Sequence, residues 1–391
     1  NSIASGGIRN TVIGDEAGTA ITTGDSNVAV GYEALKNEDA HGTNTAIGTQ
    51  TLFSLNAGVD AYNTAVGFQA GGTVSTGTQN TLIGGLAGDA LTDADYNIAI
   101  GVNALGADTL GSGSVAIGRA ALEIQNFASA TTTYNTAVGY LAGNRVTTGV
   151  QNTLIGGLAG DALTDADYNV AIGLSALGAD TLGSKTVAIG YGTLGTQNFT
   201  TATDTYNTGV GYNAGVAITT GLKNTLIGGI AGDAIDTGDE NVTVGYNSLT
   251  TNTKSFYNVA VGNSALAAHN LTSDAAGYNT GIGHNAGAAI TTGTAQVLIG
   301  ALAGDALTDA DYNIAIGVAA LSADTLGSKS VAIGHAALTA QNFTSATDTF
   351  NTAVGYAAGT AITTGVQNTL IGGLAGDAIT TGSYNSAVGM S

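Results

Sequence analysis

The chain has 391 residues, but its composition argues against the two or three ordinary domains that this length suggests. With 61 glycines, no proline, no cysteine and 43% hydrophobic residues, it is not a disordered chain and has no disulfide or thiolate metal site. The formal net charge of −20 makes nucleic acid an unexpected partner, because an acidic surface repels phosphate. No run of about 18 apolar residues occurs, so no membrane span is expected.

One short unit, which opens with Asn-Thr-Ala-Val-Gly or a close variant, repeats along the whole chain. Successive units are 17 residues apart, except for one spacing of 19 and four of 21. Every fourth spacing is a 21, so a superperiod of 72 residues runs from residue 63 towards 391. Such self-similarity is typical of a solenoid. The 22 units begin at residues 10, 27, 44, 63, 80, 97, 114, 135, 152, 169, 186, 207, 224, 241, 258, 279, 296, 313, 330, 351, 368 and 385.

Three positions of the unit carry most of the pattern. The first is Asn in 18 of the 22 units, the fourth is always Val or Ile, and the fifth is always Gly. Residues two and four of a strand share one face, so we expect these mostly β-branched side chains to form an aliphatic spine inside the coil. The compulsory Gly predicts a bend with φ > 0 or a close approach of two backbones. Representative structural residues are Asn63, Val66, Gly67, Asn135, Val138, Gly139, Asn207, Val210 and Gly211.

These features predict an all-β fold, a parallel β-solenoid or β-roll of about 22 coils, over a single continuous domain, 1–391. Most coils have 17 residues and every fourth has 21, which allows two or three short strands and tight corners in each. We expect the first-position Asn side chains to form a ladder that bonds coil to coil. A helix is disfavoured, because Gly and β-branched residues dominate and no 3.6-residue period persists.

The third position supplies a second apolar face. Leucines recur there in phase with the superperiod, and a narrow coil encloses little volume. We therefore expect this face to be buried against other chains, most simply in a homotrimer. The leucines are Leu82, Leu154, Leu226, Leu298 and Leu370.

The 21-residue coils carry four extra residues, each time after a polar pair and an apolar residue. One interpretation is an outward loop with its apolar side chain folded back; the other is a loop that contacts a receptor once every four coils. The candidate contact residues are Phe127, Phe199, Leu271 and Phe343.

Several units resemble known fibre repeats. Ser-Val-Ala-Ile-Gly at 114–118 and 330–334 resembles the head repeats of trimeric autotransporter adhesins. Asn-Thr-Ala-Val-Gly-Phe-Gln-Ala at 63–70 resembles repeats of phage tail fibres that precede a self-cleaving chaperone. The resemblance covers nearly the whole chain and implies trimeric β-rolls at a cell surface or on a virion. Two departures remain: autotransporter head repeats are usually shorter, and this sequence contains no neck, stalk, anchor or chaperone segment.

Aspartates gather in three of the corners. The preceding Gly-Gly-Leu-Ala-Gly-Asp resembles the calcium-binding nonapeptide repeats of secreted toxins, with one extra residue. Carboxylates at this spacing are suitable ligands for Ca²⁺, but Asp also caps turns through its own backbone, and both interpretations stay open. The candidate ligands are Asp89, Asp93, Asp95, Asp161, Asp165, Asp167, Asp305, Asp309 and Asp311.

Other chemistry has little support in the sequence. The histidines His41, His269, His284 and His335 lie in different coils and have no zinc-site spacing. No serine stands in a nucleophile-elbow context, and no phosphate loop is present, so neither catalysis nor an organic cofactor is expected. Tyrosines directly before the Asn are expected to pack at corners or to stack on a glycan. They are Tyr62, Tyr96, Tyr134, Tyr168, Tyr206 and Tyr312.

The leading hypothesis is a non-enzymatic, extracellular structural fibre with an adhesive or host-recognition role, whose partners are its own copies and a cell-surface receptor or glycan. One alternative is an ice- or mineral-binding solenoid, whose sign would be a flat Thr ladder. Thr at the second position alternates with Val and Ile, which favours an inward face instead. A second alternative is a Ca²⁺-stabilised secreted repeat protein.

Overall fold

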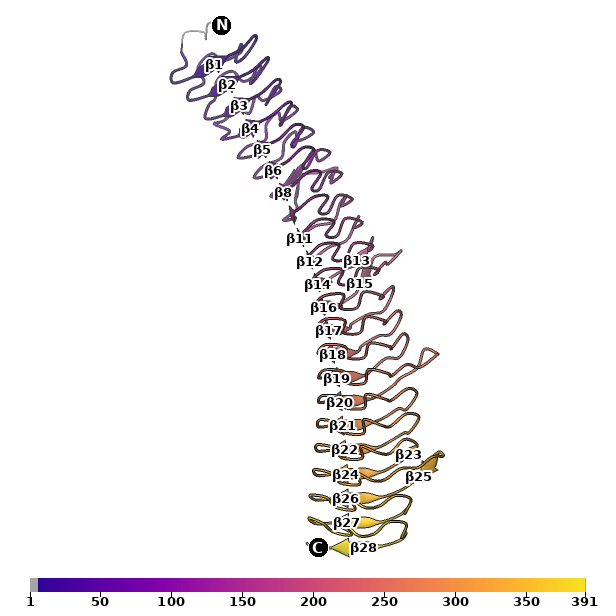
Figure 1. Ribbon diagram of the computed structural model, residues 1–391. Coiled ribbons are helices and arrows are strands. Elements are labelled where there is room, and N and C mark those ends of the chain that lie inside the picture. The colour runs from indigo at the N-terminus through magenta and orange to yellow at the C-terminus, as the bar shows by residue number, and fades with distance from the viewer. Residues whose placement is uncertain (1–5, 391) are drawn as a thin grey trace. The chain divides into compact units, whose positions relative to one another are not determined.

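The computed structural model describes residues 6–390, and these residues form strands and turns with no helix. The chain divides into two compact units. The first runs to residue 191 and includes 198–204; the second comprises 192–197 and the chain from 205 onward. Each unit is a stack of coils with one principal strand per coil (Figure 1).

The first unit contains eleven principal strands and four shorter ones. The principal strands are β1 (Thr11–Ile13), β2 (Val28–Val30), β3 (Thr45–Ile47), β4 (Thr64–Val66), β5 (Thr81–Ile83), β6 (Ile98–Ile100), β8 (Val115–Ile117), β10 (Thr136–Val138), β11 (Thr153–Ile155), β12 (Val170–Ile172) and β14 (Val187–Ile189). The shorter ones are β7 (Gly111–Ser112), β9 (Thr131–Thr132), β13 (Gly183–Ser184) and β15 (Thr203–Asp204).

The second unit contains eleven principal strands and two shorter ones. The principal strands are β16 (Thr208–Val210), β17 (Thr225–Ile227), β18 (Val242–Val244), β19 (Val259–Val261), β20 (Thr280–Ile282), β21 (Val297–Ile299), β22 (Ile314–Ile316), β24 (Val331–Ile333), β26 (Thr352–Val354), β27 (Thr369–Ile371) and β28 (Ser386–Val388). The shorter ones are β23 (Gly327–Ser328) and β25 (Thr347–Asp348).

Within each unit, neighbouring principal strands pair in parallel and in the register of the repeat. Thr136 pairs with Thr153 in the first unit, and Thr208 pairs with Thr225 in the second. The predicted all-β parallel solenoid of about 22 coils is therefore confirmed, and the same coil repeats in both units. The expectation that 1–391 forms one continuous domain stays a prediction.

The coil turns its corners with left-handed residues instead of additional strands. Most coils have one three-residue strand, where the sequence suggested two or three. In the coil that begins at Asn63, φ is positive at Gly67 (138°), Gln69 (54°), Gly71 (59°) and Gln79 (57°). Residues with such angles reverse the chain in a few steps, so a 17-residue coil closes without a second long strand.

The fifth-position Gly is compulsory for both of the reasons that the sequence suggested. At Gly67, Gly139 and Gly211, φ lies between 137° and 147°, a region that L-residues rarely adopt. A Cβ added to Gly67 would also lie 2.5 Å from the carbonyl oxygen of Gly84 in the next coil. Any side chain here would therefore push adjacent coils apart.

The orientation of the strand predicted from the sequence is wrong. The third-position residue points into the coil and is buried, while the second and fourth positions point outward. Val66, Val138 and Val210 are accordingly part-exposed and do not form an internal spine. The physical reason is space, because a coil this narrow accommodates mainly Ala at the inward strand position.

The third-position leucines are likewise interior residues, with no exposed surface, and do not face other chains. The interior makes room for them by placing glycines opposite. A Cβ added to Gly71 would lie 2.6 Å from Leu82 Cδ1, and one added to Gly88 would lie 2.8 Å from Leu82 Cδ2. Large and small residues thus alternate along the core in a complementary order.

The predicted Asn ladder is present in each unit, with the Asn side chains inside the coil. Asn135 Oδ1 accepts a hydrogen bond from the backbone N–H of Asn152 (2.9 Å), one coil further on. Its Nδ2 donates to the carbonyl of Gly149 (2.7 Å). Asn63 and Asn207 bond in the same way. Each Asn therefore satisfies buried backbone groups that no strand partner reaches.

Candidate interaction face

The second- and fourth-position side chains of the principal strands form one continuous surface along each unit. We call it the outer strand face. Its fourth position is always Val or Ile, and its second position is Thr, Val, Ile or, once, Ser. No charged residue stands at either position in any principal strand that the structure describes. Successive coils present equivalent positions in register, so the surface is uncharged and repetitive, with an aliphatic fourth position and a second position that is Thr in half of the strands.

Aromatic side chains border this face on both sides. They stand in some coils at the position before the Asn and in some directly after the compulsory Gly, and elsewhere these two positions have small, aliphatic, polar or charged residues. Tyr134 and Tyr140 flank β10 and are 65% and 52% exposed. The corner packing expected of the tyrosines before the Asn is therefore wrong, because their left-handed backbone directs them to solvent. In the second unit, the rings of Tyr257 and Tyr278 stack on neighbouring coils, 5.5 Å apart.

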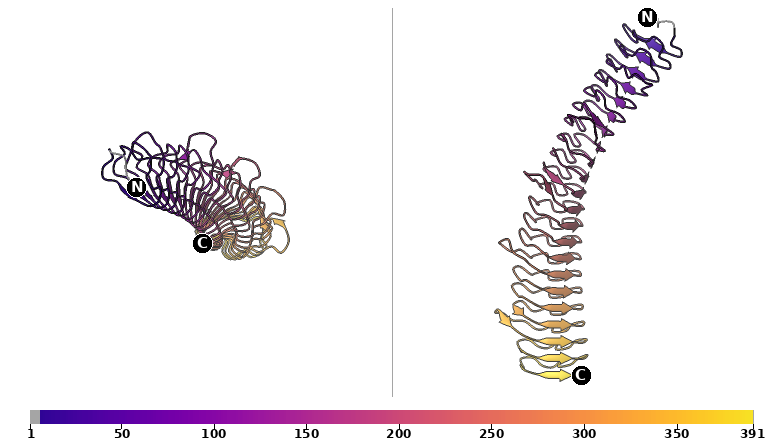
Figure 2. Two further views of the ribbon diagram at one scale, coloured as in Figure 1. Left: turned by 90° about the horizontal axis from the view of Figure 1, so that it is seen from above. Right: turned by 180° about the vertical axis from the view of Figure 1, so that it is seen from behind.

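The extra residues of the 21-residue coils form loops away from the outer strand face. In both units, the short strands at the base of these loops lie across the coil from the principal strands (Figures 1 and 2). The short strands pair in parallel, β7 with β9, β13 with β15 and β23 with β25. The tips are exposed and consist of small, often hydroxyl-bearing residues, 128–130, 200–202 and 344–346.

The apolar residues proposed as receptor contacts are turned inward. Phe127, Phe199 and Phe343 are only 6–7% exposed, and Leu271 is part-buried. The three phenylalanines therefore anchor the loops, which is the folded-back interpretation, and their rings cannot act as contact residues. The small residues that follow the phenylalanines are the exposed part of each loop.

A buried polar network holds each loop at its base. Asp108 Oδ1 accepts from the backbone N–H of Gly111 (3.0 Å), and its Oδ2 accepts from Gln125 Nε2 (2.6 Å). Gln125 also accepts from Asn135 Nδ2 (2.8 Å). Burial raises the pKa of the Asp108 carboxyl, and these donors partly oppose that effect. The same arrangement recurs with Asp324 and Gln341.

The third superperiod, residues 207–278, has Asn252 in place of Asp108 and His269 in place of Gln125. His269 Nε2 lies 3.1 Å from Ser255 Oγ, and both side chains are fully buried. Burial lowers the pKa of His269 to about 4, so the ring is neutral near pH 7. Because no solvent reaches this Ser–His pair, it belongs to the core and does not resemble a nucleophile with its base.

The aspartate triads do not converge. Among the described residues, the carboxylates of Asp89, Asp93 and Asp95, and of the two equivalent triads, do not form a group of three within 4.8 Å. Asp93 accepts from Thr76 Oγ1 (2.6 Å) and Asp95 from the backbone N–H of Thr78 (2.6 Å), both in the preceding coil.

The two equivalent triads bond in the same way, and burial raises the pKa of the first Asp of all three. These two triads are Asp161, Asp165 and Asp167, and Asp305, Asp309 and Asp311. The second and third Asp of each triad therefore join adjacent coils and do not cap their own turn, and neither the capping nor the calcium interpretation is tested by these bonds.

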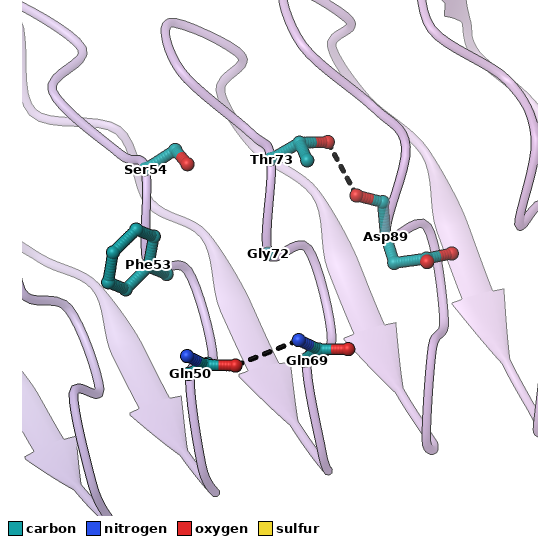
Figure 3. Close-up of a pocket in the computed structure, with 7 residues that line it drawn as sticks. All are labelled: Gln50, Phe53, Ser54, Gln69, Gly72, Thr73 and Asp89. Carbon is teal, nitrogen blue, oxygen red and sulfur yellow. Dashed lines mark hydrogen bonds between the residues drawn. The ribbon is translucent and has the colours of Figure 1, made fainter.

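A depression of about 360 Å³ lies on the first unit, next to the first Asp of one triad (Figure 3). Gln50, Gln69, Thr73 and Asp89 line it together with Phe53. Gln69 Nε2 donates to Gln50 Oε1 (2.8 Å), and Thr73 Oγ1 donates to the carbonyl of Asp89. The lining therefore offers amides, hydroxyls, a carboxylate and one aromatic ring.

The outer strand face is the feature that the sequence reading missed. The alternation of the strand showed that positions two and four share a side, but both sides of the strand are apolar, so alternation alone did not tell inside from outside. The signal that separates them is the small residue at position three together with Asn at position one. A buried Asn needs backbone partners, and the coil interior supplies them.

The described part of the chain contains no helix with the length and apolarity needed to cross a membrane. Comparison with family models, with curated proteins and with solved structures gives no match.

Proposed function

We propose that this chain is a non-enzymatic segment of an extracellular fibre, on a cell surface or a virion, that assembles as a homotrimer through its outer strand face. The observation that carries the proposal is that face itself: it is uncharged and built from Thr, Val and Ile in every principal strand except the last, which has Ser at its second position. A contiguous apolar surface of this extent is rare on a monomer, and an identical surface on another copy is its simplest partner. The resemblance to trimeric fibre repeats supports three copies.

The loops of the 21-residue coils are the proposed contacts with a receptor or glycan. They project from the side of the coil opposite the outer strand face, so assembly through that face leaves them accessible (Figures 1 and 2). Their exposed tips carry hydroxyl groups, and their buried phenylalanines fix them in place. Repetition in each superperiod would give an assembled fibre many weak contacts, which add up to avidity.

The test is the mass in solution of three forms of the full chain. We expect the unmodified chain to sediment at three times its chain mass. Val138→Lys combined with Ile155→Lys places two charges in the outer strand face, and we expect this variant to sediment as a monomer with an unchanged far-ultraviolet spectrum. Ser129→Lys in a loop tip is the matched control and should stay trimeric. A monomeric unmodified chain, or a trimeric double variant, would refute the proposal.

An ice-binding solenoid is the second candidate, because the outward orientation of position two favours it more than the sequence suggested. Thr11, Thr45, Thr64 and Thr81 all point outward from a flat parallel ladder. Trimer assembly and ice binding would use the same outer strand face, so a trimer that buries this face could not bind ice with it. A monomer that produces thermal hysteresis would support ice binding, and a trimer without hysteresis would support the fibre.

A further inference from the structure

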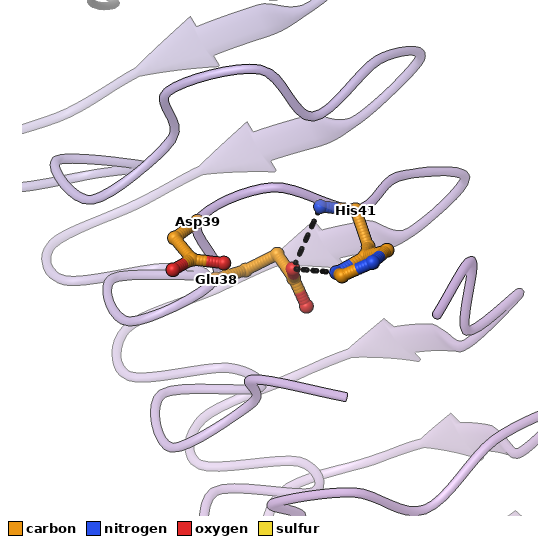
Figure 4. Close-up of side chains that lie close together, drawn as sticks. All are labelled: Glu38, Asp39 and His41. Atoms are coloured by element: carbon orange, nitrogen blue, oxygen red, sulfur yellow. Dashed lines mark hydrogen bonds and ion pairs between the residues drawn. The ribbon is translucent and has the colours of Figure 1, made fainter. Parts of the chain in front are cut away.

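Three side chains that can ligate a metal lie together in the coil that begins at Asn27. Glu38, Asp39 and His41 each offer one ligand atom, and these atoms all lie within 4.8 Å of one another (Figure 4). They come from one short corner segment, 38–41. This is the only group of three such residues within the part of the chain that the structure describes.

Glu38 is out of place in the repeat. It occupies the twelfth position of its coil, where neighbouring coils bury Ile21, Leu55 and Val74. Its side chain has no exposed surface, and its Oε2 atom has no hydrogen-bond partner. Lys36, the nearby cation, is paired with Glu16 and Glu33 instead. A buried carboxylate without a counter-charge costs several kcal/mol, so the position calls for a compensating cation.

His41 is held beside Glu38 with a free ring nitrogen. Its backbone N–H donates to Glu38 Oε1 (3.2 Å), and its carbonyl accepts from Asn27 Nδ2 (3.2 Å). The Nδ1 atom is buried and makes no hydrogen bond. It lies 4.0 Å from Glu38 Oε1, too far for a hydrogen bond. Ligand atoms of one tetrahedral Zn²⁺ lie about 3.3–3.4 Å apart, so a bound ion would draw these two side chains together by about 0.6 Å.

We propose that Glu38, Asp39 and His41 form a binding site for one divalent transition-metal ion of the Zn²⁺ class. The donor set of one imidazole nitrogen and two carboxylate oxygens suits Zn²⁺ and its neighbours, whereas Ca²⁺ takes oxygen ligands only. Asp39 is at least part-exposed at the rim, so solvent can complete the coordination. The ion neutralises the buried Glu38 and ties the corner of this coil together, independently of how the chain assembles.

The experiment is equilibrium dialysis of the full chain against Zn²⁺, with metal content measured per chain. We expect one ion per chain. Glu38→Leu installs the aliphatic residue of the neighbouring coils, so it should fold at least as stably without metal while losing the ion. His41→Ala should weaken Zn²⁺ binding at least tenfold. His335→Ala removes a histidine outside the group and should bind as the unmodified chain does.

Dialysis against Ca²⁺ at the same concentration separates this site from a general attraction of cations to an acidic surface. We expect at least tenfold weaker binding of Ca²⁺. No bound Zn²⁺, or the same Zn²⁺ content in Glu38→Leu and the unmodified chain, would overturn the proposal. Equal binding of Ca²⁺ and Zn²⁺ would also overturn it, because His41 would then not be a ligand.

Discussion

In strand β11, Leu154 and Ile155 are consecutive residues of similar size, yet Leu154 is completely buried and Ile155 is 37% exposed. The inner row of the ladder is enclosed by its own coil, by the Asn side chains and by glycines of adjacent coils. The outer row is only partly covered by the described part of the chain. The comparison teaches that this fold builds two apolar surfaces and uses only one of them for its own core. Substitutions in the inner row should therefore affect stability, and those in the outer row should affect association.

The largest effect is expected where the ladder permits no side chain at all. Gly84 has φ of 138°, and a Cβ there would lie 2.5 Å from the carbonyl oxygen of Gly101. Gly84→Ala should lower the free energy of unfolding by about 4 kcal/mol or more, measured by urea denaturation. Gly85→Ala is the adjacent control, since a Cβ at Gly85 meets nothing within 4 Å. Equal effects at the two positions would contradict the close approach of coils.

The pair in β11 gives the next largest effect. Leu154→Ala leaves a cavity in the core and should cost about 3 kcal/mol, independently of protein concentration. Ile155→Ala should cost about 1 kcal/mol within one chain but weaken association, so its unfolding midpoint should depend more strongly on protein concentration. If both variants behaved alike in a dilution series, the distinction between the rows would be wrong.

The Asn ladder predicts a somewhat smaller loss. Asn152 donates to the carbonyl of Ala166 (2.7 Å) and accepts from the backbone N–H of Asn169 (3.0 Å), all inside the coil. Asn152→Leu leaves both groups unsatisfied and should cost about 2 kcal/mol by the same measurement. Asn152→Gln is the control, because Gln296 keeps both types of bond at the same position of another coil. A Gln variant as unstable as the Leu variant would show that the bonds are not the cause.

Acid should weaken the third superperiod in particular. The pKa of His269 is lowered from 6.5 to about 4, so below pH 6.5 the unfolded chain binds a proton that the folded chain does not. Its contribution to stability is full at pH 8 and falls by about 1.4 kcal/mol by pH 5.5. His269→Gln, the residue of the other superperiods, should remove this part of the pH dependence. Hydrogen exchange of the surrounding coils measures it, and identical pH profiles would contradict the neutral buried ring.

The sequence was sufficient to predict the coil but not to predict which face of each strand is buried. Period, coil number, the glycine contact and the Asn ladder followed from residues that recur at fixed spacing, such as Asn135 and Gly139. The direction of Val138 did not follow, because Ala and Val are both apolar and only the width of the closed coil decides which fits inside. The left-handed backbone of residues such as Tyr134 carries no comparable sequence signal, so its exposure was missed too.

Glu38 illustrates a different kind of limit. Its corner matches neither a Cys–His spacing nor the aspartate triads, because this group uses Glu, Asp and a single His. The available signal was a charge at the twelfth position, where neighbouring coils have aliphatic residues. A repeat protein exposes such exceptions when its coils are aligned with one another.

The central claim is that the outer strand face is buried between copies of the chain. The chain has no cysteine, so single thiols report on it directly. Val138→Cys should react slowly with a thiol reagent and form disulfides between copies on oxidation, while Ser129→Cys in a loop tip should react quickly and stay unlinked. If Val138→Cys reacted as fast as Ser129→Cys and formed no cross-links, the face would be open to solvent and the claim would fail.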